Sequence, residues 1–114
     1  MRIRDKIKKP QRPVVAYEIL PPREKDGTLN SYAETISSLL SQTHIDAINI
    51  PEVHDEVGRG DRPVVNQKRG EPREFGMLLQ DIVGIEAIIN RVVVHDPYDR
   101  QMKWLEETNT KYEI

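Results

Sequence analysis

Three short apolar runs of strand character alternate along this chain with stretches of helical periodicity. A strand, a helix and a second strand in this order are joined most simply as parallel strands with right-handed crossovers. The pattern therefore predicts an α/β fold of order β-α-β-α-β-α, with three parallel strands in the order 1-2-3 and with Glu18, Pro51 and His95 clustered at their carboxyl ends. The predicted strands are residues 14–20, 45–53 and 85–94, and the predicted helices occupy residues 31–43, 75–84 and a stretch that begins at Pro97.

The first apolar run, "VVAYEIL", contains one charged residue, Glu18. Pro21 and Pro22 follow and cannot continue a hydrogen-bonded ladder, so the strand ends before them. Apolar residues occupy both faces of the run, which predicts a strand covered on both sides. Glu18 lies near the carboxyl end, where α/β proteins and barrels place their ligands. Position alone leaves two interpretations open: a functional carboxyl group, or a glutamate that points into water or pairs with an arginine such as Arg23.

Local signals place the helix starts and one long loop. Ser31 and Glu34 have the spacing of a capping box, and Asp96 before Pro97 predicts an N-cap followed by the first helical position. Apolar residues recur at helical spacing in each predicted helix, and in the last they are Tyr98, Met102 and Leu105. Residues 54–74 are rich in charge, glycine and proline and are predicted to form a loop. Glu52, His54, Asp55 and Glu56 carry potential metal ligands without a metal-binding spacing, which favours a solvated loop and no metal site.

Composition limits what the chain can be. Its 114 residues make at most one small domain, and with about a quarter of them Leu, Ile, Val or Phe it is expected to fold. Cysteine is absent, which excludes disulfides and cysteine nucleophiles. Residues 1–13 are a basic leader without interleaved aromatic residues, so we expect a solvated segment and no nucleic-acid partner. No apolar run has the length of a membrane span, and a cytoplasmic location without membrane contact is the default expectation.

The stretch "YEILPPRE" resembles the aromatic-Glu-x-x-Pro-Pro-Arg signature at the first strand of the methylenetetrahydrofolate reductase family. Members of that family are flavin-dependent (β/α)8 barrels that reduce the methylene group of a folate to a methyl group. The resemblance extends beyond this motif. The stretch "DAINIPEV" resembles the family's second strand, "GRGDRP" the arginine-bearing turn after it, and "GIEAIINRVVVHDPYDRQMKWLEETNTKYEI" its third strand and the following helix. The resemblance thus covers nearly the whole chain, and its specific motif lies in the first strand.

The resemblance implies roles for four residues. Glu18 corresponds to the family's acid, which protonates the folate and opens its methylene bridge to an iminium that accepts hydride. A carboxyl group on an apolar strand face would have its charged form disfavoured, which suits a proton donor. Flavin adenine dinucleotide (FAD) contacts fall on Asn49, Pro51 and Arg91. Pro51 replaces the family's usual threonine and Arg91 its frequent histidine, so we expect weak flavin binding by this chain alone.

Chain length adds an expectation about partners. A (β/α)8 barrel of about 250 residues has roughly 31 residues per βα unit, so residues 14–114 hold about three units and the barrel cannot close. We therefore expect one partial domain that acts on a folate-type small molecule only when the remaining barrel segment or a partner subunit is supplied. An open sheet has unpaired edges, which favours a homo-oligomer. The alternative is a non-catalytic α/β binding or scaffold module that self-associates.

Overall fold

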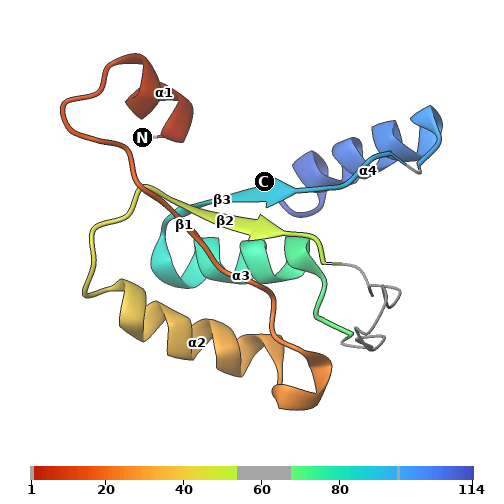
Figure 1. Cartoon of the computed structure of the whole chain (residues 1–114), viewed down its shortest axis with the longest axis horizontal. Coiled ribbons are helices and arrows are strands. Elements are labelled where there is room, and N and C mark those ends of the chain that lie inside the picture. The colour runs from red at the N-terminus through yellow and green to blue at the C-terminus, as the bar shows by residue number, and fades with distance from the viewer. Residues whose placement is uncertain (1, 54–67, 95) are drawn as a thin grey trace, which may run out of the picture.

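The computed structural model describes residues 2–53, 68–94 and 96–114. Three strands, β1 (Ala16–Glu18), β2 (Ala47–Pro51) and β3 (Glu86–Asn90), form one parallel sheet in the order β1-β2-β3 (Figure 1). The predicted parallel α/β arrangement is therefore confirmed. The helices are α1 (Ile3–Lys8), α2 (Leu29–Leu40), α3 (Pro72–Val83) and α4 (Tyr98–Thr110), with a short 3₁₀ turn η1 (Glu24–Asp26).

Helices α2 and α3 cover one face of the sheet (Figure 1). In β2 the side chains alternate, so Ile48 and Ile50 point to this covered face while Asn49 points to the other. Phe75 and Leu79 from α3 are fully buried against this layer. The core cluster consists of residues from the sheet and both helices: Ile19, Ala33, Leu40, Ile48, Ile50, Phe75, Leu79 and Ala87.

The opposite face of the sheet, which we call the open face, is not covered by α2 or α3 (Figure 1). All three residues of β1 are exposed, so the prediction of a first strand covered on both sides is wrong. β1 pairs only with β2 among the described strands and is therefore an edge strand. Tyr17 shares the helix-covered face with its register partner Ile48, yet it is 56% exposed at this edge. The apolar residues on both faces of the run had suggested burial that an edge strand with one helix layer does not have.

The molecule is less compact than its length would allow. Its radius of gyration is 15.7 Å, whereas a compact domain of this length has about 13 Å. Its accessible surface is 8417 Å², against about 6,400 Å² for a compact monomer of the same mass. The exposed apolar residues gather partly after β3 and on α4: Val92, Val93, Val94, Tyr98, Met102 and Leu105. The predicted apolar stripe of the last helix therefore lies at the surface.

Three predicted boundaries are corrected by the capping contacts. Helix α2 begins earlier than predicted, because the side chain of Thr28 accepts a hydrogen bond from the Ser31 backbone N–H and acts as N-cap in place of Ser31. Helix α3 begins within the predicted loop, since Glu71 caps it and Pro72 occupies its first position. At α4 the N-cap is Pro97 and not Asp96.

The basic leader is mostly exposed to solvent, as predicted, but it is also attached to the sheet. Residues 3–8 form α1, which lies at the amino end of the sheet on the side away from α2 and α3 (Figure 1). The backbone N–H of Ile3 donates to Glu86 Oε2 on the open face at 2.6 Å. Lys6 and Arg12 both bind the carboxylate of Asp46. These contacts join the leader to β2 and β3, so it is part of the folded unit.

Candidate functional site

A row of three polar side chains crosses the open face near the carboxyl ends of the strands. Glu18 is the last residue of β1, its register partner Asn49 lies in β2, and Asn90 is the last residue of β3. Asn90 Nδ2 donates to Asn49 Oδ1 at 2.6 Å, and Asn49 Nδ2 donates to Glu18 Oε2 at 3.4 Å. The row thus connects Glu18, the predicted acid on β1, to β2 directly and to β3 through Asn49.

The surroundings of Glu18 differ from the expectation drawn from the sequence. Its side chain is exposed, so the burial that would disfavour its charged form is not provided by this chain. The alternative ion pair with Arg23 is also not formed, because Arg23 Nε binds Asp26 at 2.5 Å. The side chain that contacts Glu18 is the amide of Asn49.

Asn90 is a site residue that the sequence analysis did not identify. It is the last residue of β3, at the same edge of the sheet as Glu18, and its side chain points to the open face. A polar residue near the carboxyl end of a strand in a parallel sheet is the same signal that drew attention to Glu18. Applied to the third strand, that signal would have identified Asn90.

Pro51 and His95 were also predicted to lie at the carboxyl ends of the strands. Pro51 is the last residue of β2 and pairs in register with Asn90. Its ring supplies no hydrogen-bond donor. His95 was expected at the carboxyl end of the third strand, but it lies outside the described residues, as do His54, Asp55 and Glu56. Glu52, which follows β2, accepts a hydrogen bond from Arg91 at 3.4 Å.

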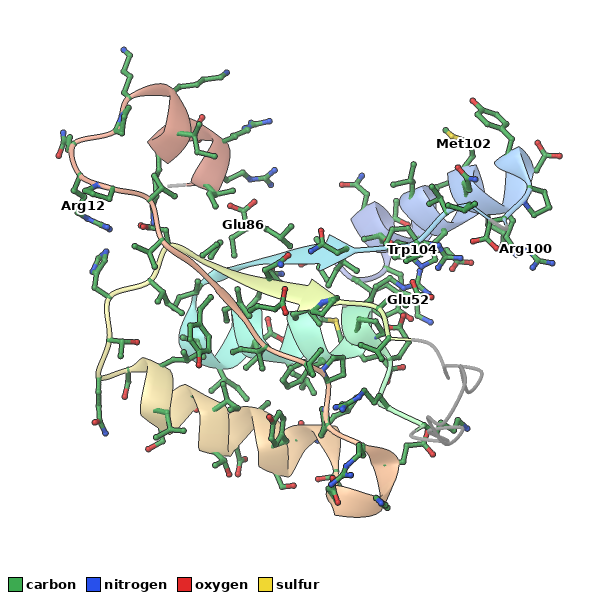
Figure 2. The ribbon with its side chains drawn as sticks, viewed as in Figure 1. Arg12, Glu52, Glu86, Arg100, Met102 and Trp104 are labelled. Atoms are coloured by element: carbon green, nitrogen blue, oxygen red, sulfur yellow. The ribbon has the colours of Figure 1, made fainter. Side chains whose placement is uncertain are left out.

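Arg91 belongs to a compact network that attaches α4 to the rest of the fold. Its guanidinium lies 4.7 Å from the ring centroid of Trp104 and binds Asp96 at 2.5 Å and Glu52 at 3.4 Å. The guanidinium of Arg73 lies 5.0 Å from the same ring. Trp104 therefore contacts two arginines, and Figure 2 shows it on the side of α4 toward Glu52, with Met102 on the far side.

The guanidinium of Arg73 contacts two aromatic rings and two carboxylates. It lies 4.6 Å from the ring centroid of Tyr112 and forms ion pairs with Glu71 at 2.8 Å and Glu107 at 3.4 Å. Burial disfavours its charged form, but the hydrogen bond and charge of Glu71 outweigh that effect and raise the pKa of Arg73 above its ordinary value. The pairing stabilises the cation between the two rings.

These contacts show how far the described residues fit a flavin. The guanidinium of Arg91 is bound by two carboxylates and an aromatic ring, and the amide of Asn49 is bound by Asn90 and Glu18. Pro51 has no donor to offer. The Asn49 amide and two guanidinium nitrogens of Arg91 thus already have partners, and Arg91 Nε is buried without one, so these three positions alone fit FAD poorly.

A second polar cluster lies at the opposite, amino end of the sheet and was also missed. The buried carboxylate of Asp46 accepts hydrogen bonds from the Val15 backbone N–H at 2.9 Å, Lys6 Nζ at 2.9 Å and Arg12 Nη2 at 2.8 Å. These bonds, the one from Val15 foremost, hold the pKa of Asp46 far below its ordinary value of 3.8 despite its burial. A cavity of about 190 Å³ lies beside it, lined by Lys6, Lys9, Pro10, Gln11, Arg12, Val14 and Asp46.

Two kinds of feature are absent from the described residues. Within residues 2–53, 68–94 and 96–114, no group of three or more His, Cys, Asp or Glu side chains is arranged to hold a metal ion. Over the same part of the chain, no helix has the length and apolar character needed to cross a membrane.

No protein-family model matches the sequence, and no curated protein is significantly similar to it. The class is therefore defined by the fold and the residues: an α/β protein that, over its described residues, has a three-stranded parallel sheet, four helices, and a polar row at the carboxyl ends of its strands.

Proposed function

We propose that the chain supplies the first three βα units of a (β/α)8 reductase of the methylenetetrahydrofolate type, with Glu18 as the proton donor to a folate-type substrate. The observation that supports this most is the location of Glu18, at the end of β1 on the face without α2 and α3 and in contact with Asn49. In a barrel this face would line the interior, and its carboxyl end is where barrel enzymes carry their active sites.

The chemistry assigned to Glu18 is one proton transfer. Its carboxyl group gives a proton to the folate nitrogen that leaves the methylene bridge, and the carbon–nitrogen bond breaks to leave an iminium and a Glu18 carboxylate. Reduction to a methyl group then requires a hydride. We infer that further βα units supply the flavin contacts and complete the low-dielectric surroundings in which proton transfer is effective. A cytoplasmic location is part of the same proposal.

The test uses a chimera in which this chain replaces the corresponding units of an active reductase. Glu18→Gln keeps the size and hydrogen-bonding reach of the side chain but removes the transferable proton. Folate reduction should fall by roughly 10²- to 10⁴-fold, the usual range for loss of a general acid. Flavin reduction by the electron donor, which needs no such acid, should be unchanged. Glu34→Gln, an exposed change on α2, is the matched control.

Either of two results would overturn this assignment. A wild-type chimera that folds and binds flavin but does not reduce folate would remove the proposed activity. Equal loss of both half-reactions in Glu18→Gln would make Glu18 a structural residue. In the isolated chain we expect little or no quenching of flavin fluorescence on titration, because Arg91 and Asn49 are already bound by other side chains.

A second candidate is a non-catalytic α/β module that self-associates. The exposed apolar residues after β3 and on α4 favour it, because a surface of this kind is usual at protein–protein contacts. In that case Glu18→Gln would leave every half-reaction of the chimera unchanged.

A further inference from the structure

The Asn49 side chain makes two hydrogen bonds that are possible only in one orientation of its amide. Its Oδ1 accepts from Asn90 Nδ2 at 2.6 Å, and its Nδ2 donates to Glu18 Oε2 at 3.4 Å. An ionised carboxylate is an acceptor only, and the Asn90 Nδ2 group is a donor only. Rotating the Asn49 amide by half a turn would place oxygen against oxygen and NH₂ against NH₂.

Asn90 is well placed to impose this orientation. The register partner of Asn49 on β3 is Ile88, and Asn90 lies two residues further on the same face, within diagonal reach of polar side chains. Its bond to Asn49 is the shorter of the two. The Glu18 side chain has no other hydrogen-bond partner among the described residues. The orientation of Asn49 therefore decides whether an NH₂ group or an oxygen faces the Glu18 carboxyl group.

We propose that Asn90 is a positioning residue that acts on Glu18 through Asn49. Asn90 fixes the Asn49 amide with its NH₂ group toward Glu18, and that group occupies Oε2. The neutral carboxyl group then carries its proton on Oε1, the oxygen that faces away from Asn49. The hydrogen-bond relay from Asn90 through Asn49 to Glu18 is argued from geometry alone, whereas its effect on catalysis rests on the proposed function of Glu18.

The relay is tested by NMR on the full 114-residue chain, in solution or by magic-angle spinning. The probe is the Asn49 side-chain amide, assigned by its disappearance in Asn49→Asp and followed while glutamate side chains are titrated with acid. We expect the amide protons to move with pH in the wild type and to stop responding in Glu18→Gln. Asn90→Ala should reduce the response at least threefold, while Asn30→Ala, an exposed change on α2, should leave it unchanged.

Asn90→Asp is a second variant of nearly the same shape. Its carboxylate cannot donate to Asn49 Oδ1 and attracts the Asn49 NH₂ group, so it should turn the amide around. The new carboxylate also titrates, so the pH response of this variant should be the same with and without Glu18→Gln. Backbone spectra that superimpose on the wild type outside the row show that the fold is retained. A wild-type response in Asn90→Ala would overturn the relay, and so would an Asn49 amide that does not respond to Glu18 in the wild-type chain.

The catalytic consequence is measured in the chimera. Asn90→Ala should lower kcat about threefold to tenfold, the equivalent of one net hydrogen bond, with KM unchanged. In a Glu18→Gln background the same change should have no further effect, because the group it positions is gone. If Glu18→Gln itself leaves activity intact, the proposed function fails while the NMR result still decides the relay. If Glu18→Gln is inactive and Asn90→Ala is fully active, the positioning role is refuted.

Discussion

Replacing Arg91 by methionine should detach α4 from the end of the sheet. The substitution keeps an unbranched apolar side chain but removes the guanidinium that lies 4.7 Å from the Trp104 ring centroid and binds Asp96 and Glu52. The side chain of Arg91 is only 17% exposed and those of its two carboxylate partners 18%. The lost interactions are therefore shielded from water more than those of an ordinary surface pair.

The size of the effect follows from these contacts. One cation–π contact contributes about 0.5–1 kcal/mol, and a hydrogen bond to a charged group about 1.5–3 kcal/mol. Because the Glu52 contact is long, we count one such bond and expect Arg91→Met to lower the free energy of unfolding by about 2–4 kcal/mol. At about 2.1 cal/mol/K per residue for the entropy of unfolding, this corresponds to a fall in Tm of roughly 8–17 °C.

Arg100→Met is the matched control. Arg100 approaches the same Asp96 at 4.0 Å, and its side chain is 71% exposed; Figure 2 shows it apart from Trp104, toward the start of α4. Such a pair contributes less than about 1 kcal/mol, so Tm should fall by no more than about 2–4 °C. Thermal unfolding is followed by far-ultraviolet circular dichroism at one protein concentration, and the emission of Trp104, the single tryptophan, reports its local surroundings. Equal Tm values for the two variants would refute a structural role for Arg91.

Two further predictions concern acid stability and association. Asp46→Asn should lower Tm at neutral pH, and the difference in Tm from the wild type should narrow as pH falls below the ordinary aspartate pKa of 3.8. The reason is that a carboxylate whose pKa is depressed in the folded state stabilises that state only while it is ionised. Thermal scans from pH 7 to pH 2 measure this, and a difference in Tm that stays constant would contradict it. The isolated chain should self-associate at micromolar concentration, given its unpaired edge strands and its surface of 8417 Å²; sedimentation velocity that shows a stable monomer would count against this expectation.

The order and direction of the strands could be predicted because they depend on signals within short stretches of sequence. Apolar runs ended by proline, and helical periodicity between them, suffice to indicate parallel βα units. The contacts that complete the fold join residues far apart. Asp46 is bound by Lys6 and Arg12, which are 40 and 34 residues away, and nothing near Asp46 in the sequence indicates those partners.

Helix α4 shows a second limit of sequence patterns. Tyr98, Met102 and Leu105 have the spacing of a buried stripe, yet they are exposed. The contacts of α4 with the rest of the fold include instead Trp104, which packs against the guanidinium groups of Arg73 and Arg91, and Glu107, which pairs with Arg73. A hydrophobic pattern counts arginine as polar, although its planar group stacks on aromatic rings. The side of the helix that packs was therefore not visible in the apolar spacing.

The pairing between Val15 and Asp46 has a consequence for the opposite end of the sheet. The Asp46 carboxylate accepts from the Val15 backbone N–H, while the Val15 carbonyl accepts from the backbone N–H of Asp46. This reciprocal pair fixes where β1 starts against β2. A slip of one residue would turn Glu18 from the open face to the helix-covered face and bring Tyr17 or Ile19 into the polar row. The side on which Glu18 emerges is thus determined by an aspartate at the far end of the neighbouring strand.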